Sequence, residues 1–285
     1  MARAVVSEAE AILDQEFGVL DKGFVRLVDY LGGDERIVQS ARVSYGKGTK
    51  TFREDRGLIR YLMRNRHTSP FEQVVLTFHA KMPVFVARQW VRHRTARLNE
   101  ISGRYSVMSD EFYLPSLEQV SYQSTSNRQG RGETLPEEEA QRAVEAMRLQ
   151  QEQAYAGYEN LLEAGLAREL SRVNLPLSVY TEWYWQIDLN NLFHFLSLRL
   201  DEHAQYEIRK YAERIFEIAR AVCPCACEAF EDFVLHAETF SRAELNALRQ
   251  LATGAEAGRL EALAREAGLT ERELERFVAK LQRRT

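Results

Sequence analysis

The segment from residue 88 to residue 104 concentrates positive charge, because five arginines share it with a single acidic residue, Glu100. The basic residues of this segment are Arg88, Arg92, His93, Arg94, Arg97 and Arg104. Like charges at this density repel one another unless solvent or a bound anion compensates them. A planar guanidinium makes paired, charge-assisted hydrogen bonds to phosphate oxygens, so the segment predicts an anion-binding site. An exposed basic helix end is the alternative interpretation of the same residues.

Several other chemistries lack the residues that they need. No G-x-G-x-x-G motif follows a strand-like run, and residues 46–49 lack the glycine spacing of a phosphate loop. His194 and His203 are not at a same-face helical spacing and no H-E-x-x-H motif occurs, so we do not expect a zinc hydrolase. Cys223, Cys225 and Cys227 are the only cysteines and have no C-x-x-C spacing. We therefore predict no metal there, and a structural turn in which Pro224 begins a helix.

Composition narrows the class of protein. The chain has 285 residues, 45% of them hydrophobic, and 38 basic against 42 acidic residues give a net charge of −4. A general nucleic-acid coat protein would be far more basic, and an odd number of cysteines argues against a secreted disulfide scaffold. Ser7, Glu8 and Glu10 interrupt the place of a signal peptide, and no window is long and apolar enough to cross a membrane. We expect a cytoplasmic protein without membrane partners.

The elements that must position the basic segment follow from periodicity and from helix-end signals. Strands are expected near residues 24–30, 74–81 and 179–187, and helices near 34–44, 54–65, 84–92, 189–199 and up to 222. A further long helix with an apolar stripe is expected to open at residues 134–137 and to end near Gly165. Asp34 and Asp188 are placed to cap helices, and residues 69–72 and 134–137 have the form of capping boxes. There is no regular βαβ alternation. The fold class predicted is α+β, with a mixed sheet and long helices.

The C-terminal segment, from about residue 237, has no strand-like run. Ser241 with Glu244 and Thr270 with Glu273 predict further helix starts, so we expect three short helices. Residues 260–277 have a helix–Gly–helix pattern typical of a helix-turn-helix. Residues 254–285 nevertheless hold seven basic and six acidic residues, a balance that does not favour nucleic-acid binding. The predicted domains are 1–236 and 237–285, with the second as a helical extension packed on the first.

An ordered set of motifs carries a resemblance to a known family. Arg92-His93-Arg94, followed after seven residues by Ser102 and by Gly103-Arg104-Tyr105-Ser106, resembles the signature of flavin-dependent thymidylate synthases, the ThyX family. Further segments resemble the family in the same order, and they lie at residues 40–45, 67–72, 85–90, 127–130, 175–177, 198–199 and 203–208. The resemblance spans residues 20–235.

The resemblance implies an activity and an assembly. Members of the family transfer a one-carbon unit from 5,10-methylenetetrahydrofolate to C5 of dUMP, with FAD as redox mediator and NADPH as reductant. They form homotetramers with active sites between subunits. By position, the residues expected around dUMP are Gln89, Arg92, Glu100, Ser102, Gly103, Arg104, Arg172 and Arg199. The residues expected to contact FAD are Ser44, Ser69, Arg92, His93, Arg94, Glu100, Asp188, Asn190 and His194. His67 is expected on the folate side of the flavin.

The residue types suit this chemistry. C5 of a pyrimidine is a poor nucleophile until a fixed cation stabilises negative charge on the ring, and Arg199 is the candidate for that catalytic role. A helix-terminal arginine that complements the helix dipole is the alternative. For Ser102 we expect a hydrogen bond to the nucleotide rather than a covalent bond, because no general base is identifiable beside it. His93 is expected to be neutral among the arginines. Arg97 departs from the family pattern and is either a further FAD contact or solvent-facing.

Two other functions are weighed against the flavoenzyme. One is a nucleotide sensor that keeps the fold and contacts DNA through its C-terminal helices. The other is a classical thymidylate synthase, which would need a cysteine nucleophile that the clustered cysteines do not fit. The presence of Gln89, Glu100, His67 and the arginines together favours catalysis.

Overall fold

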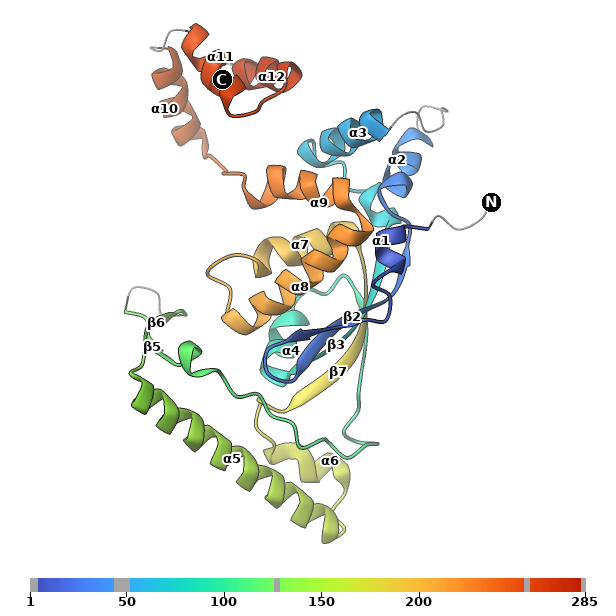
Figure 1. Ribbon diagram of the computed structural model, residues 1–285, viewed down its shortest axis with the longest axis vertical. Coiled ribbons are helices and arrows are strands. Elements are labelled where there is room, and N and C mark those ends of the chain that lie inside the picture. The colour runs from blue at the N-terminus through green and yellow to red at the C-terminus, as the bar shows by residue number, and fades with distance from the viewer. Residues whose placement is uncertain (1–4, 44–51, 126–128, 254–256, 283–285) are drawn as a thin grey trace. The chain divides into compact units, whose positions relative to one another are not determined.

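The computed structural model describes residues 5–43, 52–125, 129–253 and 257–282. The chain divides into two compact units, residues 1–235 and 236–285. The first unit combines a sheet with helices (Figure 1), which confirms the predicted α+β class. The second is helical only, within the described residues.

A five-stranded sheet forms the centre of the first unit, in the order β1-β2-β3-β7-β4. The strands are β1 (Glu16–Val19), β2 (Gly23–Leu31), β3 (Val75–Pro83), β4 (Arg97–Glu100) and β7 (Tyr180–Asp188). Each neighbouring pair is antiparallel, so the predicted mixed sheet is wrong in this respect. The long connections between β2 and β3 and between β3 and β7 leave and re-enter the sheet at the same end, because Leu31 pairs with Val75 and Pro83 with Tyr180.

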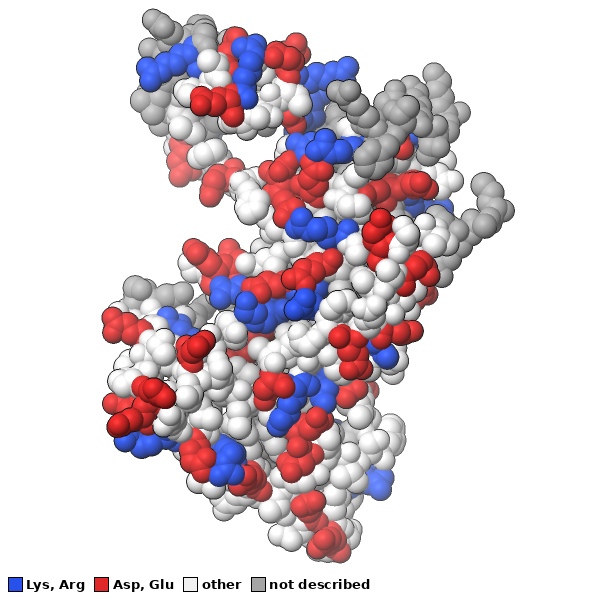
Figure 2. Space-filling view, in the orientation of Figure 1, with Lys and Arg blue, Asp and Glu red and all other residues white. Residues whose placement is uncertain are grey.

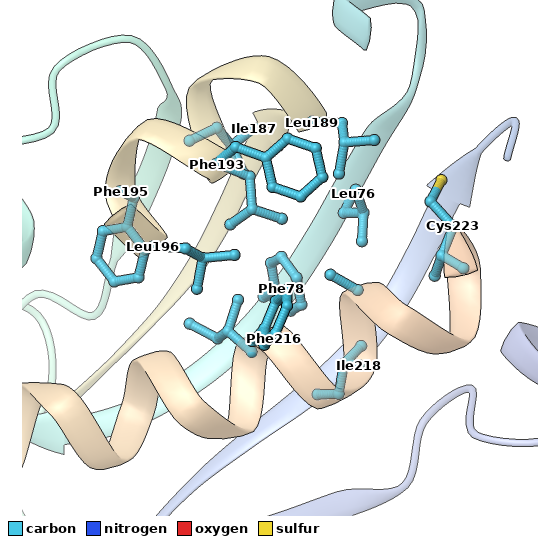
Figure 3. Packing of buried hydrophobic residues seen from close by; sticks show 14 of the residues in the cluster. Leu76, Phe78, Ile187, Leu189, Phe193, Phe195, Leu196, Phe216, Ile218 and Cys223 are labelled. Atoms are coloured by element: carbon cyan, nitrogen blue, oxygen red, sulfur yellow. The ribbon is translucent and has the colours of Figure 1, made fainter. Parts of the chain in front are cut away.

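Helices α4 (Val84–Trp90), α7 (Leu189–Arg199) and α8 (Tyr206–Val222) cover one face of this sheet (Figure 1). Alternate side chains of β3 are fully buried under them, because successive side chains of a strand point to opposite faces. Figure 3 shows this core, with Leu76 and Phe78 of β3 beside Phe193 of α7 and Phe216 of α8. An aromatic cluster continues it, and the Trp90 ring centroid lies 5.1–5.9 Å from four others, those of Trp183, Trp185, Phe195 and Tyr211. Helix α4, which carries the start of the basic segment, is therefore anchored in the core.

The predicted helix caps have two outcomes. Asp188 is confirmed, because its Oδ1 accepts the backbone N–H of Asn191 at 3.0 Å at the start of α7. Asp34 is the first residue of α2 (Asp34–Arg42) but does not cap it. Its carboxylate instead accepts the N–H groups of Cys225 at 2.7 Å and Ala226 at 3.0 Å, in the first turn of α9 (Pro224–Phe230). The prediction is wrong because these donors, far away in the sequence, have no acceptor within α9.

The two capping boxes predicted in the first unit are wrong. Residues 71–73 form a single 3₁₀ turn without a side-chain cap, since β3 begins at Val75 and leaves no room for a helix. The long helix α5 (Glu137–Glu163) begins after Pro136, and Thr134 is paired in β6 (Arg131–Thr134) with Ser121. The end of α5 is as predicted, with Gly165 at a φ of +80°. The apolar stripe predicted for α5 is only partly buried within one chain, and Met147 is 41% exposed.

The remaining helices and strands of the first unit lie outside the five-stranded sheet and its covering helices. They are α1 (Ser7–Glu10), α3 (Phe52–Arg64), α6 (Arg168–Ser171) and the strand β5 (Ser121–Gln123), which pairs with β6. Pro224 occupies the first turn of α9, as predicted. The three cysteines are buried and unbridged, and burial raises the pKa of the Cys225 thiol to about 12.

The second unit holds α10 (Arg242–Thr253), α11 (Ala257–Glu266) and α12 (Glu271–Gln282), the three helices that the sequence predicts. Its first capping box is present in both directions, because Ser241 N donates to Glu244 Oε2 at 2.8 Å and Glu244 N donates to Ser241 Oγ at 3.3 Å. Across the described residues of the whole chain, no helix has the length and hydropathy to span a membrane.

Candidate active site

A pocket of about 340 Å³ opens where the turn after α4 meets α7. Its lining comes from two stretches far apart in the sequence, and consists of Arg92, His93, Arg94, Thr95, Ile187, Asn191, His194, Leu198 and Arg199. The sheet explains why they meet, because α4 follows β3 directly and α7 follows β7 directly, and β3 and β7 are neighbours. Arg92, His93 and Arg94 of the basic segment therefore line one pocket with His194 and Arg199 of α7, as expected for neighbouring site residues.

Arg199 and His93 interact directly at this pocket. Arg199 Nε donates to His93 Nε2 at 3.1 Å, and Arg199 Nη2 donates to the backbone oxygen of Gln89 at 3.4 Å. Burial, followed by the charge of Arg199 and the proximity of His194, lowers the pKa of His93 to about 4. His93 is therefore a neutral acceptor at physiological pH, in line with the expectation. Burial also lowers the pKa of Arg199, whose side chain is half-buried.

Arg92 and Arg94 place two positive charges at the pocket. Both side chains are exposed, and among the described residues neither guanidinium makes a hydrogen bond or an ion pair. Asn191 and His194 of α7 add polar groups to the same pocket. A cationic wall with free N–H donors suits the phosphate groups of a bound nucleotide, so the residues present fit a flavin nucleotide. Within the described residues, no cluster of side chains could hold a metal ion.

A second cluster gathers around the turn after β4. Gly103 is buried, and a Cβ built on it would lie 2.8 Å from the Met108 sulfur and 3.0 Å from Arg172 Cδ, so glycine allows this close approach. Arg104 Nε donates to Glu169 Oε2 at 3.1 Å. Ser102 Oγ accepts the backbone N–H of Arg104 at 3.3 Å, which leaves its own hydroxyl proton for a ligand.

The strand β4 separates the two clusters. Arg97 pairs with Gln186 and Glu100 with Trp183, so β4 runs from the pocket end of β7 toward its opposite end. Four residues of strand cover about 10 Å. Glu100 lies at the far end, where its Oε1 accepts the Thr181 hydroxyl at 2.6 Å. Within one chain, the residues from Ser102 to Arg104 therefore do not line the pocket that holds Arg199.

The remaining expected residues lie elsewhere. His67 and Ser69 are exposed after α3, where the His67 ring is 5.7 Å from that of Tyr61. Ser44 lies outside the described residues. Asn190 does not line the pocket, whereas Asn191 does and donates to Asp188 Oδ2 at 2.7 Å.

Several contacts were not predicted from the sequence. The lining residues Thr95, Ile187 and Asn191 were missed, although Thr95 lies inside the basic segment, and Leu198 was quoted only as part of a motif. Gln205 was quoted only as part of a motif, and the structure shows that it contacts Gln89. Arg97 donates to Gln186 Oε1 at 3.3 Å, on the sheet rather than in the pocket.

Comparison with known proteins decides the family. Residues 26–225 match the family described as "Thymidylate synthase complementing protein", and residues 238–285 match "Thymidylate synthase ThyX C-terminal domain". A flavin-dependent thymidylate synthase of Treponema denticola is 59% identical over 271 residues, which cover 95% of this chain and 98% of that protein. The chain belongs to the flavin-dependent thymidylate synthase family. The resemblance that the motifs predict is confirmed, and the classical thymidylate synthase is set aside.

Other relatives agree with this family. The flavin-dependent thymidylate synthase of Gluconobacter oxydans is 52% identical over 284 residues, covering 98% of this chain and 92% of that protein. A crystal structure of the UMP/dUMP methylase PolB from Streptomyces cacaoi with 5-Br dUMP matches with a TM-score of 0.71 and 33% identity, covering 77% of this chain and 99% of that one. The two bacterial relatives are named as flavin-dependent thymidylate synthases and PolB as a methylase, and helices α10–α12 lie within the residues that match the ThyX C-terminal domain.

Proposed function

We propose that this protein methylates dUMP reductively to dTMP, with 5,10-methylenetetrahydrofolate as carbon donor, FAD as redox mediator and NADPH as reductant. The pocket carries the proposal, because His93 accepts a hydrogen bond from Arg199 in a pocket that Arg92 and Arg94 also line. The solved relative with 5-Br dUMP supports a pyrimidine nucleotide as substrate.

Arg199 is the proposed catalytic residue. A guanidinium has five N–H groups, and of the contacts that the described residues make, one N–H goes to His93 and one to the Gln89 oxygen. The remaining N–H groups can stabilise the negative charge that develops on N3 and the carbonyl oxygens of the uracil as C5 becomes nucleophilic. Because the side chain is half-buried, this charge is screened less than it would be in water.

The proposed FAD contacts include Arg92, His93, Arg94 and His194, which line the pocket. Asp188 and Asn190, at the start of α7, are proposed as further contacts. FAD supplies the redox chemistry that side chains lack, so no redox cysteine is required. The folate side, by resemblance, includes His67. Ser44, Ser69 and Glu100 complete the proposed FAD set.

The separation of the two clusters supports a site shared between subunits. We propose that Arg199, Gln89 and Arg92 of one copy meet Glu100, Ser102, Gly103, Arg104 and Arg172 of another in a homotetramer. A closed symmetric assembly repeats such a site without additional sequence. Residues 1–236 would carry the whole site, with 237–285 as an accessory helical domain.

The test is spectroscopic and chemical. Purified protein should show the visible spectrum of a bound flavin, which NADPH bleaches under anaerobic conditions. dTMP should form only when dUMP and methylenetetrahydrofolate are both present. A protein that neither binds FAD on reconstitution nor forms dTMP would contradict the proposal, and sequence-specific DNA binding would favour the sensor.

A further inference from the structure

We propose that Glu207, a residue outside the pocket, is a positioning residue that orients the Gln89 side chain through Gln205. The inference rests on the proposed function, which places Gln89 at dUMP. Glu207 lies in the first turn of α8 and is only 1% exposed. Burying a carboxylate costs free energy unless several hydrogen-bond donors surround it, so the donors around Glu207 indicate its role.

Glu207 divides its two oxygens between two tasks. Its Oε1 accepts the Tyr113 hydroxyl at 2.9 Å and a hydrogen bond from Arg131 of β6. Its Oε2 accepts Gln205 Nε2 at 2.8 Å. Oε1 thus holds the β5–β6 hairpin against the start of α8 through Arg131 (Figure 1). Oε2 is hydrogen-bonded to Gln205.

The hydrogen bonds continue from Gln205 to the site. Gln205 Oε1 accepts Gln89 Nε2, and the backbone oxygen of Gln89 accepts Arg199. The two glutamines are 116 residues apart in the sequence. The relay therefore connects a buried charge to a proposed dUMP contact next to the catalytic arginine.

The carboxylate fixes the direction of this relay. Paired with Arg131, Glu207 can only accept, so the Gln205 amide must turn its nitrogen toward Glu207 and its oxygen toward Gln89. Gln89 must then donate with its nitrogen, which leaves its own oxygen and one N–H at defined positions for the nucleotide. Without Glu207, both amides could rotate together, because their two ends are nearly the same in shape.

The test measures dUMP affinity separately from folding in the FAD-loaded enzyme. Gln205→Ala breaks the relay at an exposed residue, so Tm should stay within about 2 °C of the unmodified enzyme. The KM for dUMP should rise roughly tenfold, the effect of about one hydrogen bond, while kcat changes far less. Glu207→Gln should raise the same KM and also lower Tm, since Arg131 loses the negative charge of its buried partner.

Tyr113→Phe is the matched control, because it removes a hydrogen bond to Oε1 and leaves Oε2 with Gln205. It should lower Tm without raising the KM for dUMP. The double variant Gln205→Ala/Glu207→Gln should have a KM no higher than the Gln205→Ala variant, because both act on one relay.

A normal KM in a stable Gln205→Ala enzyme would overturn the inference and leave Glu207 a purely structural residue. This holds even if Glu207→Gln does not fold. Failure of the unmodified enzyme to form dTMP would instead contradict the proposed function, so the two failures are distinguishable.

Discussion

Arg199 and His93, 106 residues apart in the chain, share a hydrogen bond of 3.1 Å from Nε to Nε2. A protonated imidazole has no lone pair to accept it, so this contact requires neutral His93. The environment meets that requirement by lowering the pKa of His93 to about 4. The histidine thereby holds the arginine in place without competing for the negative charge of a substrate.

Arg199→Ala should reduce kcat at least about 100-fold while the flavin spectrum persists, because a preorganised cation is lost from the transition state. Arg199→Lys should recover only part of the rate, since lysine keeps the charge and loses the planar fork. Single-turnover formation of dTMP measures both. Arg148→Ala, which removes an exposed arginine paired within α5, is the control with normal turnover. Near-normal turnover of Arg199→Ala would remove the catalytic assignment.

Arg104→Ala and Arg199→Ala should each be inactive alone and regain activity when denatured together and refolded. If the two arginines of one site come from different subunits, a hybrid pair has one site with both lesions and one with neither. Random mixing makes half of the pairs hybrid, so activity should return to about a quarter of the unmodified level. Each variant refolded alone is the control. Hybrids that are seen by mass spectrometry but stay inactive would place both arginines in one chain.

His93 should make folding less stable in acid. Its pKa is about 4 in the folded protein against 6.5 for the free group, so the unfolded chain binds the proton first as the pH falls. The stability that neutral His93 contributes is fully present above about pH 6.5 and is lost progressively as the pH falls toward 4. The shift corresponds to about 3 kcal/mol, which solvent screening of this half-exposed ring reduces to about 1–2 kcal/mol. The difference in unfolding free energy between the unmodified protein and His93→Gln should follow this window, and a flat difference would contradict it.

Asp34→Ala should lower the free energy of unfolding by about 1–3 kcal/mol, because two N–H groups at the start of α9 lose their acceptor. Asp34→Asn keeps one acceptor oxygen and should cost less. Urea unfolding measures both variants. Glu35→Ala removes the exposed neighbouring carboxylate and serves as the control. Equal stability of Asp34→Ala and Glu35→Ala would show that the cap is not needed.

Charge is distributed evenly where the surface can be seen. On the face shown in Figure 2, basic and acidic side chains lie close to one another rather than in separate fields. On α8, for example, Lys210 pairs with Glu213 at 2.7 Å. Such pairing does not favour a phosphate-tracking surface there, in agreement with the composition.

The sequence alone determined the features that depend on nearby residues. The strands β3 and β7, the cap at Asp188 and the box of Ser241 with Glu244 all depend on residues a few positions apart, so propensity and spacing were sufficient. The family was also readable, because the arginine motif that ends in Ser102 and Gly103 is joined by further family-like segments, in the same order, between residues 20 and 235.

The tertiary structure decided which distant groups become partners. Asp34 caps a helix about 190 residues away, Arg199 binds His93, and Gln205 binds Gln89, and none of these contacts has a local signal. Because β3 and β7 are neighbours in the sheet, the turn after α4 meets α7 and His93 meets Arg199, whereas β4 runs away from the pocket. The sequence could therefore name most residues of the candidate site, but only the fold shows that one chain divides them between two places.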